Sequence, residues 1–294
     1  MLLLDKPPGL SSSMALQQAK RLLNAEKAGH AGTLDPLATG LLPLLFGEAT
    51  KFAQYGLDSD KTYLAVVRLG VTTETGDAEG KVLQARPVAV TEDALQAALA
   101  AFRGEIEQVP PMYSALKKDG RPLYELAREG KAVERAARPV TIHALELLGR
   151  GPERLDLRVA CSKGTYIRQL AVDLGEALGC GAHLEGLRRT GAGAFTLDGA
   201  VTLEALQALP ESERAGILLP PDRLLEGLPR VDLPADLARR LLHGQGVPLP
   251  GQPAGCCRIY RADGALLGVG QADGAGRLHP VRLLAGTAPA SASG

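Results

Sequence analysis

The spacing of apolar residues along the chain predicts both strands and helices. Segments that are apolar throughout, or that alternate with polar residues, are typical of strands, and they lie at residues 2–4, 41–46, 63–69, 105–109, 113–117, 139–148 and 154–161. Apolar residues at helical spacing predict helices at residues 14–23, 48–55, 91–102, 165–178, 201–208 and 234–242. These elements are interspersed without a regular strand–helix–strand rhythm, which favours an α+β fold with a mostly antiparallel central sheet flanked by helices.

Two of these helices have recognisable caps. Ser12 or Ser13 can accept a hydrogen bond from the first turn of the helix at residues 14–23. Thr91 can do the same for the helix that follows it, whose first turn also carries acids that suit the helix dipole.

The character of the chain changes at residues 210–230. This stretch is rich in proline, leucine and acids, and we predict a linker there. Beyond it the chain has short β-rich pieces, and the pairs Asp263-Gly264 and Asp273-Gly274 are typical of hairpin turns. We therefore predict a large domain at residues 1–226 and a compact β module at residues 229–290, followed by a loose tail.

Composition indicates an ordinary globular protein. Apolar residues make up 45% of the chain and charged residues 22%. No apolar run reaches the roughly 18 to 20 residues that span a bilayer. The three N-terminal leucines are followed at once by Asp5 and Lys6, which does not fit a signal peptide. We therefore expect a cytoplasmic protein with no membrane contact.

The sequence offers no convincing metal site. The four cysteines are scattered, and Cys180 and His183 form a single C-x-x-H pair that no second pair completes. The GDAEG segment in the polar loop at residues 70–80 loosely resembles a calcium loop but lacks the required spacing of carboxylates. We expect Cys180 and His183 to serve packing, and no metal to be bound.

Charge alone argues against a simple nucleic-acid binder. Lysines and arginines number 33, as do aspartates and glutamates, whereas many such proteins are strongly basic. The balance is uneven, because the chain from Pro229 onward has seven arginines and four acids. Binding would have to use local basic clusters, such as Lys117-Lys118 with Arg121, and Arg188-Arg189.

The densest candidate for chemistry is the segment GHAGTLDPLATG at residues 29–40. Its three glycines, Gly29, Gly32 and Gly40, permit backbone conformations and close approaches that a side chain forbids. Asp35 is the only carboxylate among residues 27–47, and Pro36 favours an extended conformation for it. Such an acid suits a nucleophile or base. The residues alone give equal weight to a plain Asp-Pro turn.

This segment, taken whole, resembles the signature of the TruB family of tRNA pseudouridine synthases. Four other blocks resemble further motifs of that family in the same order. They are Leu4-Asp5-Lys6-Pro7-x-Gly9, then Lys61-x-Tyr63 with Arg68-Leu69-Gly70, then Cys161-Ser162-Lys163-Gly164-Thr165-Tyr166-Ile167-Arg168, and Leu187-Arg188-Arg189. The stretch Pro110-Pro111-x-Tyr113-Ser114-Ala115-x-Lys117, with Gly120, Tyr124, Ala127, Arg128 and Gly130, resembles the RNA-contacting insertion of the family, at about residues 108–135.

The resemblance implies roles for three catalytic residues. Asp35 matches the nucleophile, and Arg168 matches the arginine that pairs with it. Tyr63 matches the tyrosine that packs on the target base and could accept a proton. Outside the resemblance, Arg168 would be an ordinary surface arginine and Tyr63 a core aromatic of a strand.

Other matched residues would bind substrate. Tyr166 and Leu187 match walls of the uracil pocket, although Leu187 could equally be plain core. His30 matches a histidine that fills the space left by extruded nucleotides, where a loop histidine is otherwise a hydrogen-bonded structural residue. Lys6 would support the site or meet phosphate; without the resemblance it is a solvated lysine.

The implied function is isomerisation of uridine to pseudouridine at position 55, in the T loop of tRNA. The fold would be the pseudouridine synthase fold with a C-terminal β-rich PUA-like domain, and the mobile insertion would close on RNA through Lys117, Lys118 and Arg121. No cofactor or protein partner is implied, and a monomer is the default. Attack at the sugar, loss of the base through a glycal, and attack at uracil C6 all stay open.

Two rival functions are weaker. A non-catalytic RNA-binding or RNA-folding protein on the same fold would not need the set of Asp35, Tyr63 and Arg168. An aspartate-dependent hydrolase, such as a glycosidase, usually needs two carboxylates facing one bond, and we find no second acid in these five blocks at a position the family uses.

Overall fold

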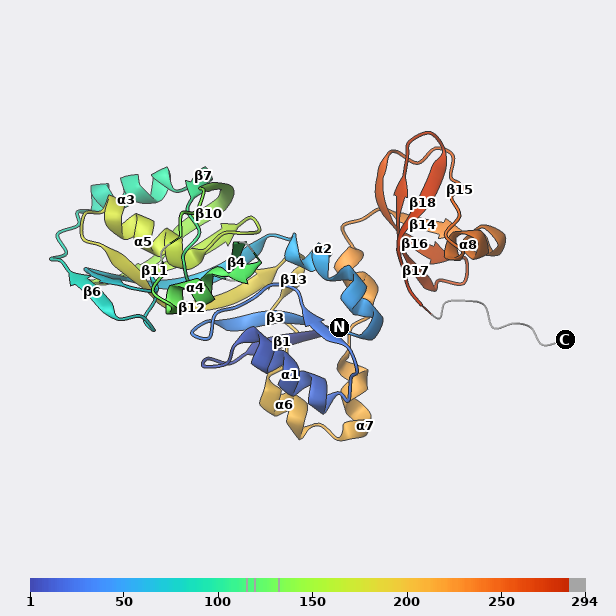
Figure 1. Cartoon of the computed structure of the whole chain (residues 1–294), viewed down its shortest axis with the longest axis horizontal. Helices are drawn as coiled ribbons and strands as arrows, with labels where there is room; N and C mark the ends of the chain where they lie inside the picture. The colour runs from blue at the N-terminus through green and yellow to red at the C-terminus, as the bar shows by residue number, and fades with distance from the viewer. Residues whose placement is uncertain (115, 119, 132, 286–294) are drawn as a thin grey trace.

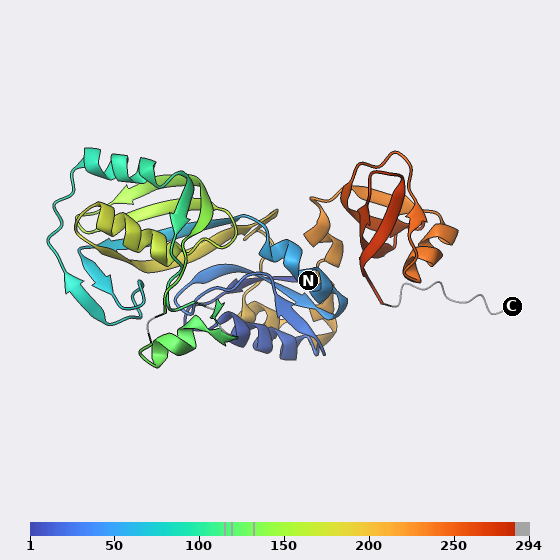
Figure 2. The same cartoon turned by 45° about the horizontal axis from the view of Figure 1, so that its top comes forward.

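The computed structural model describes residues 1–114, 116–118, 120–131 and 133–285. Figure 1 shows two bodies, a large one built on a long sheet and a smaller β-rich one beside it. Helices and strands follow one another without a regular strand–helix–strand rhythm, as in an α+β fold. Figure 2 shows the same arrangement from a second direction. The predicted fold class is thus confirmed.

The large body is organised by a nine-stranded sheet. Its order is β1-β3-β12-β4-β11-β10-β7, with β2 added to β3 and β13 added to β12. The strands are β1 (Leu2–Lys6), β2 (Ala28–His30), β3 (Thr39–Phe46), β4 (Lys61–Leu69), β7 (Gly104–Gln108), β10 (Arg138–Arg150), β11 (Arg154–Cys161), β12 (Ala182–Ala192) and β13 (Phe195–Thr196). Every named pairing in this sheet is antiparallel except that of β12 with β3.

Strand β12 lies inside the sheet, between β3 and β4, yet the sequence pattern predicts no strand there. Its register against β4 shifts twice, between Leu184 and Gly186 and between Arg189 and Gly191. Each bulge moves the inward-facing set of side chains by one residue, so no alternation is kept along the strand. The prediction failed because the strand is bulged and contains two glycines.

Helices cover the sheet and complete its core. They include α1 (Ser12–Leu22), α3 (Glu92–Ala101), α5 (Ile167–Ala177) and α6 (Leu203–Ala208). Helix α5 buries Leu170 and Leu174 in the same core cluster as strand residues Val67 and Leu184. Burying such an apolar stripe contributes most of the stability of an amphipathic helix.

The caps of two helices test the sequence predictions. Thr91 accepts from the N–H of Ala94 and caps α3, as predicted. For α1 the prediction of Ser12 or Ser13 was wrong, because Ser11 is the cap and accepts from the N–H of Met14 at 3.2 Å. Ser12 is buried instead and is used to hold the loop that carries Asp35.

Two connecting segments differ in detail from the predictions. The predicted helix at 48–55 is a 3₁₀ helix, η1 (Gly47–Phe52), followed by α2 (Ala53–Leu57). The predicted loop at 70–80 begins with β5 (Val71–Thr73), which pairs with β6 (Val82–Ala85).

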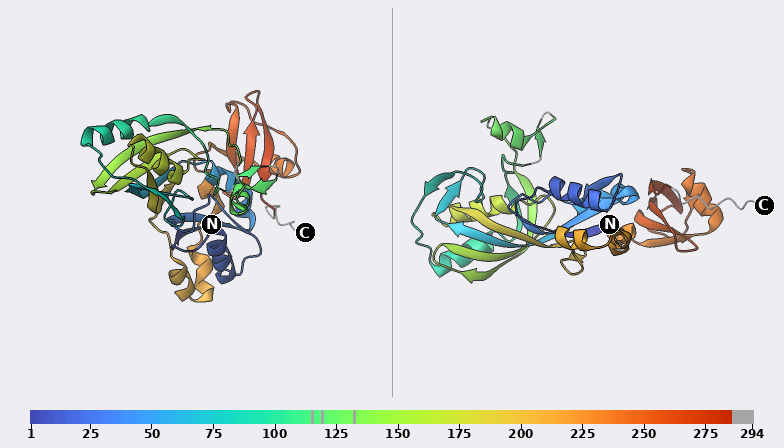
Figure 3. Two further views of the ribbon diagram at one scale, coloured as in Figure 1. Left: turned by 60° about the vertical axis from the view of Figure 1, so that its left-hand side comes forward. Right: turned by 90° about the horizontal axis from the view of Figure 1, so that it is seen from below.

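The strand predicted at 113–117 was wrong. That region has bends, Ala115 lies outside the described residues, and the chain continues as β8 (Lys117–Lys118), β9 (Arg121–Pro122) and α4 (Leu123–Arg128). The helix α4 was not predicted. The segment that carries it stands away from the sheet, drawn in green in Figure 3.

The predicted linker is an ordered connection. It contains α7 (Glu211–Arg214), η2 (Ala215–Ile217) and η3 (Pro221–Leu225). The N-terminal ammonium of Met1 donates to the carbonyl of Leu219 at 2.5 Å. Leu225 is fully buried and packs with Phe52 of the large body and Val269 of the small one. The connection is therefore packed into the fold, and the expectation of a plain linker was wrong.

The small body is a five-stranded sheet with one helix. Its strands, in the order β14-β16-β17-β18-β15, are β14 (Arg230–Leu233), β15 (Val247–Pro248), β16 (Gly255–Arg261), β17 (Leu266–Ala272) and β18 (Arg277–Leu283), and its helix is α8 (Ala235–Leu242). Gly264 and Gly274 have φ values of +85° and +76° in the two predicted hairpin turns. Residues 286–290 of the predicted module, and the tail, lie outside the described residues.

Within the described part of the chain, no helix is long and apolar enough to cross a membrane.

Candidate active site

Asp35 lies in the connection between β2 and β3, and the backbone on each side of it is fixed. The buried Ser12 hydroxyl accepts from the N–H of Leu34 at 2.7 Å and donates to the carbonyl of Leu34 at 3.0 Å. The N–H of Gly9 donates to the carbonyl of Pro36 at 2.9 Å. A carboxylate on a loop held in this way has little freedom to move, although its side chain is 36% exposed.

The guanidinium of Arg168 holds the Asp35 carboxylate with both arms of its fork. Its Nε donates to Oδ2 at 2.9 Å and its Nη2 to Oδ1 at 3.2 Å. The same group donates to the carbonyls of Thr75 at 3.1 Å and Tyr113 at 2.7 Å. Arg168 is only 5% exposed, so it is a buried residue of α5 rather than an ordinary surface arginine. Bidentate pairing fixes both the position and the orientation of the carboxylate.

A second carboxylate, which the sequence analysis did not find, lies behind this pair. Asp77 Oδ2 is 3.5 Å from Arg168 Nε, and Asp77 is buried. Its Oδ1 accepts from the Thr75 hydroxyl at 2.5 Å and from the N–H of Glu79 at 3.1 Å. Because Asp77 is enclosed behind the guanidinium, it cannot face a substrate bond opposite Asp35, as a second glycosidase acid must.

Two tyrosines come close enough to Asp35 to sense its charge. Tyr63, on β4, is 8% exposed; burial raises the pKa of its hydroxyl, the neighbouring Arg189 guanidinium opposes that rise, and the charge of Asp35 adds a smaller increase. Tyr166 precedes α5 and is half-buried, and burial likewise raises the pKa of its hydroxyl. Both hydroxyls therefore keep their protons at neutral pH.

Gln108 positions Tyr166 and was also missed. Its side-chain amide donates to the carbonyl of Tyr166 at 3.1 Å and accepts from the N–H of Tyr166 at 2.8 Å. Gln108 is buried at the end of β7, where the insertion begins. The sequence gives no indication of this contact, because Gln108 and Tyr166 are far apart in the chain and a glutamine at the end of a strand is ordinary.

Leu187 and His30 lie on strands beside the Asp35 loop. Leu187 is partly buried on β12, opposite Ala65 of β4, within the main core cluster. Burial lowers the pKa of His30, and the charge of Arg189 lowers it further, so the ring is neutral at physiological pH. Among the described residues, its buried Nδ1 has no hydrogen-bond partner.

Lys6 is an internal residue and does not meet phosphate. It is fully buried, and its ammonium donates to the carbonyls of Pro7 at 2.9 Å, Leu10 at 2.6 Å and Pro36 at 3.4 Å. Burial lowers its pKa to about 8, with Asp35 as the main charge that opposes the shift. Of the two predicted roles, the geometry fits support of the Asp35 loop, and the reading as a solvated lysine was wrong.

The predicted basic clusters behave differently from one another. Lys117, Lys118 and Arg121 lie exposed on the insertion, where Arg121 pairs with Glu129 at 2.5 Å. Arg189, in contrast, is only 1% exposed, so the expectation that it meets phosphate was wrong. Its neighbour Arg188 forms a two-armed ion pair with Asp5, at 3.0 and 2.6 Å.

No metal site emerges within the described residues. No group of three or more His, Cys, Asp or Glu side chains lies close enough together there to hold an ion. Cys180 is buried, and Nδ1 of His183 is 2.8 Å from the carbonyl of Val71. The pair therefore packs inside the fold.

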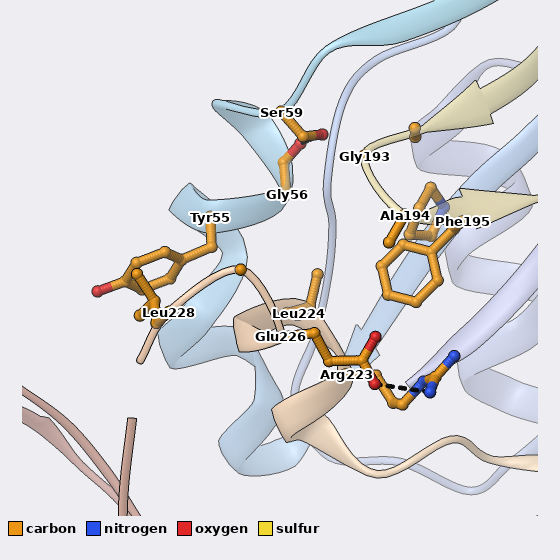
Figure 4. Close-up of a pocket in the computed structure, with 13 residues that line it drawn as sticks. Tyr55, Gly56, Ser59, Gly193, Ala194, Phe195, Arg223, Leu224, Glu226 and Leu228 are labelled. Carbon is orange, nitrogen blue, oxygen red and sulfur yellow. Dashed lines mark hydrogen bonds and ion pairs between the residues drawn. The ribbon is translucent and has the colours of Figure 1, made fainter. Parts of the chain in front are cut away.

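An apolar cavity of about 330 Å³ lies away from these residues. Figure 4 shows it between α2, the turn from β12 to β13, and the η3 segment, with Tyr55, Phe195 and Leu224 among its walls. None of the predicted site residues lines it. The candidate active site is therefore the surface around Asp35, not this cavity.

Only two of the three glycines in the Asp35 loop adopt a backbone conformation that favours glycine. Gly32 and Gly40 have φ values of +114° and +97°, whereas Gly29 does not need a positive φ. A Cβ on Gly40 would collide with the carbonyl oxygen of Arg189 and lie 2.9 Å from its nitrogen. The close approach of β3 to β12 therefore requires glycine at position 40.

Gly40→Ala should destabilise the protein by about 3 kcal/mol, because it adds left-handed backbone strain to a backbone collision. Urea unfolding measures the loss. The control is Gly104→Ala, which has a φ of +84° but open space around the added carbon, and should cost about 1 kcal/mol. Equal losses in the two variants would show that the contact with Arg189 does not matter.

Solved structures with this fold are known. A structure titled "Crystal Structure of a Cbf5-Nop10-Gar1 Complex" has a TM-score of 0.71 at 30% identity, covering 92% of this chain and 77% of that one. One titled "Structure of H/ACA RNP bound to a substrate RNA containing 2'-deoxyuridine" has a TM-score of 0.72 at 26% identity, covering 96% and 84%.

Sequence comparisons define the class as pseudouridine synthases. Family models match residues 20–167 (TruB family pseudouridylate synthase, N terminal domain), 168–226 (tRNA pseudouridylate synthase B C-terminal domain) and 229–284 (Pseudouridine synthase II TruB, C-terminal). The tRNA pseudouridine synthase B of Aromatoleum aromaticum is 61% identical, over 100% of this chain and 95% of that protein. That of Ralstonia nicotianae is 62% identical, over 97% and 93%. The chain belongs to the TruB family.

Proposed function

We propose that this protein converts a uridine of tRNA to pseudouridine, at position 55 of the T loop, with Asp35 as the nucleophile. The observation that carries the proposal is the two-armed contact of Arg168 with Asp35, at 2.9 and 3.2 Å, on a loop whose sequence matches the family signature. The names of the relatives, tRNA pseudouridine synthase B, support tRNA as the substrate.

The reaction makes demands that these residues meet. The N1–C1′ bond of the uridine breaks, and C5 of the same base is joined to the same sugar carbon. A fixed carboxylate can attack the sugar or assist loss of the base. The detached base must turn without escaping, and Tyr63, Tyr166 and Leu187 offer flat and apolar walls for it.

The target base must leave the RNA stack before it can reach Asp35. Flipping costs roughly a few kcal/mol, and side chains that stack into the gap offset part of that cost. His30 suits this task, because its ring is neutral and half-buried, and its Nδ1 has no partner among the described residues. A neutral ring stacks between bases without a buried charge.

Binding would be shared between two regions outside the pocket. We assign residues 1–226 to catalysis and residues 229–290 to a PUA-like RNA-binding domain. Within the first, we assign the insertion at about 108–135 to phosphate contacts through Lys117, Lys118 and Arg121. The exposure of these three side chains supports the assignment of the insertion. Recognition of a shaped loop would reduce the need for a uniformly basic surface, which fits a net charge of zero.

Tritium release from a tRNA transcript labelled at C5 of uridine tests the reaction and the position together. The protein should release tritium from a transcript with uridine at position 55. It should release none from the matched transcript with cytidine there. Sequencing after chemical derivatisation should place the product in the T loop. Release from the cytidine transcript at the same rate would refute the position, and no release from either would refute the reaction.

A further inference from the structure

The side chain of Arg189 occupies an unusual place for an arginine. It lies on the interior strand β12 and is only 1% exposed. Its Nε donates to the carbonyl of Leu41 at 2.6 Å, and its Nη2 donates to the carbonyl of Gly32 at 3.1 Å. Its Nη1 approaches the carbonyl of Thr33 at 3.5 Å. These carbonyls belong to the two arms of the loop, before and after Asp35, so one guanidinium joins both arms.

The backbone of Arg189 reinforces the same junction. Arg189 is opposite Gly40 in the pairing of β12 with β3, and Gly40 is the point where a Cβ could not fit. The added Cβ of Gly32 would lie 3.3 Å from Nη1 of Arg189. The arms of the loop are therefore in direct contact with this residue through both main chain and side chain.

Burying this charge is costly for folding. Within the described part of the chain, Arg189 forms no ion pair with a carboxylate; its guanidinium donates to carbonyls and also interacts with the Tyr63 hydroxyl, opposing the rise of that pKa. Its charge also lowers the pKa values of two other buried cations, Lys6 and Lys61, and of His30. An apolar side chain would fill the position without this repulsion. Stable proteins rarely bury a charge without an oppositely charged partner, and exceptions of this kind are typical of functional sites.

We propose that Arg189 is a positioning residue, which sets the place of the Asp35 carboxylate by fixing the separation of the two arms of its loop. Its contacts are with the loop and with the Tyr63 hydroxyl, and it does not touch substrate. A planar fork of five N–H donors can span three carbonyls, whereas the single ammonium of a lysine cannot. The inference rests on the proposed role of Asp35 as nucleophile.

The test uses Arg189→Met and Arg189→Lys in the full chain, with single-turnover tritium release from the tRNA transcript. We expect the rate to fall about 100-fold in both, because small misplacements of a reacting group are that costly. The dissociation constant for the transcript should change less than about threefold. Lysine should not rescue the rate, although it keeps the charge.

Arg214→Met is a matched control. Arg214 also donates to three carbonyls, of Leu209, Leu22 and Gln207, but it lies on α7. Its loss should lower stability and leave the rate unchanged. A second readout is the pKa of His30 by NMR, which should rise in Arg189→Met because the guanidinium lowers it in the native protein.

Three outcomes would overturn the inference. One is a folded Arg189→Lys or Arg189→Met protein whose rate is close to that of the native protein. Another is an equal loss of rate in Arg214→Met, which would indicate general loosening. The third is a rate loss explained entirely by weaker binding of the transcript. If Arg189→Met does not fold, Arg189→Lys alone decides. Failure of Asp35 as nucleophile is detected separately, by activity of Asp35→Asn.

Discussion

Asp35→Asn should abolish tritium release from the labelled tRNA transcript, lowering the single-turnover rate by at least about 10,000-fold. Asparagine keeps the shape of the side chain, and its oxygen can still accept one hydrogen bond from Arg168. It lacks the negative charge, and an amide is a poor nucleophile. Since the proposed RNA contacts are spread over the insertion and the C-terminal domain, the dissociation constant of the transcript should change by less than about threefold.

Glu176→Gln is the matched control for this variant. Glu176 is also held by both arms of an arginine, Arg86, and it lies on α5, the helix that carries Arg168. It is exposed to solvent and lies near the opposite end of that helix from Arg168. Its variant should turn over normally. If Asp35→Asn turned over at a rate near that of the native protein, the carboxylate would not be the nucleophile.

Regular periodicity made part of the fold predictable from sequence. The strand β4 alternates buried and more exposed residues along its length, and the helix α3 has a threonine cap with acids after it. Such signals are local, so they survive without any knowledge of tertiary contacts. Strand β12 was missed because two bulges interrupt its alternation. An interior strand was therefore missed, although its neighbour β4 was predicted.

The contrast between Arg188 and Arg189 follows from the missed strand. Adjacent residues of a strand point to opposite faces. One arginine pairs with Asp5 and remains partly exposed, and the other is buried beneath the Asp35 loop. Without the strand, both were taken as one basic cluster. Recognition of β12 would have separated them by geometry alone.

The partners of Asp35 were beyond local reasoning. The residues of its ion pair are 133 positions apart, and only resemblance to the TruB family linked them before the structure was known. Asp77 was not predicted as a site residue, because only its contact with Arg168 marks it as one, and nothing in its own loop indicates that contact. Contacts of this kind depend on how the turn after β5 lies against α5, which sequence spacing does not encode.

Arg168→Lys should lower the single-turnover rate by about 1,000-fold, because a single ammonium cannot hold both carboxylate oxygens of Asp35. Arg168 also ties the loop to the carbonyls of Thr75 and Tyr113. The smaller group would leave some of these four contacts unmade. Single-turnover tritium release measures the effect, and a rate within about tenfold of the native rate would contradict the positioning argument.

Arg168→Met should have a second effect, on stability, and this effect can be reversed. It leaves the buried Asp77 carboxylate without its cation, which should cost about 3 kcal/mol in urea unfolding. Asp77→Asn in the Arg168→Met background removes that charge, while the amide oxygen can still accept from Thr75 and Glu79. Stability should return and activity should not. If the double variant is as unstable as the single one, the unpaired carboxylate is not the cause. If activity returns, Arg168 is not required to hold Asp35.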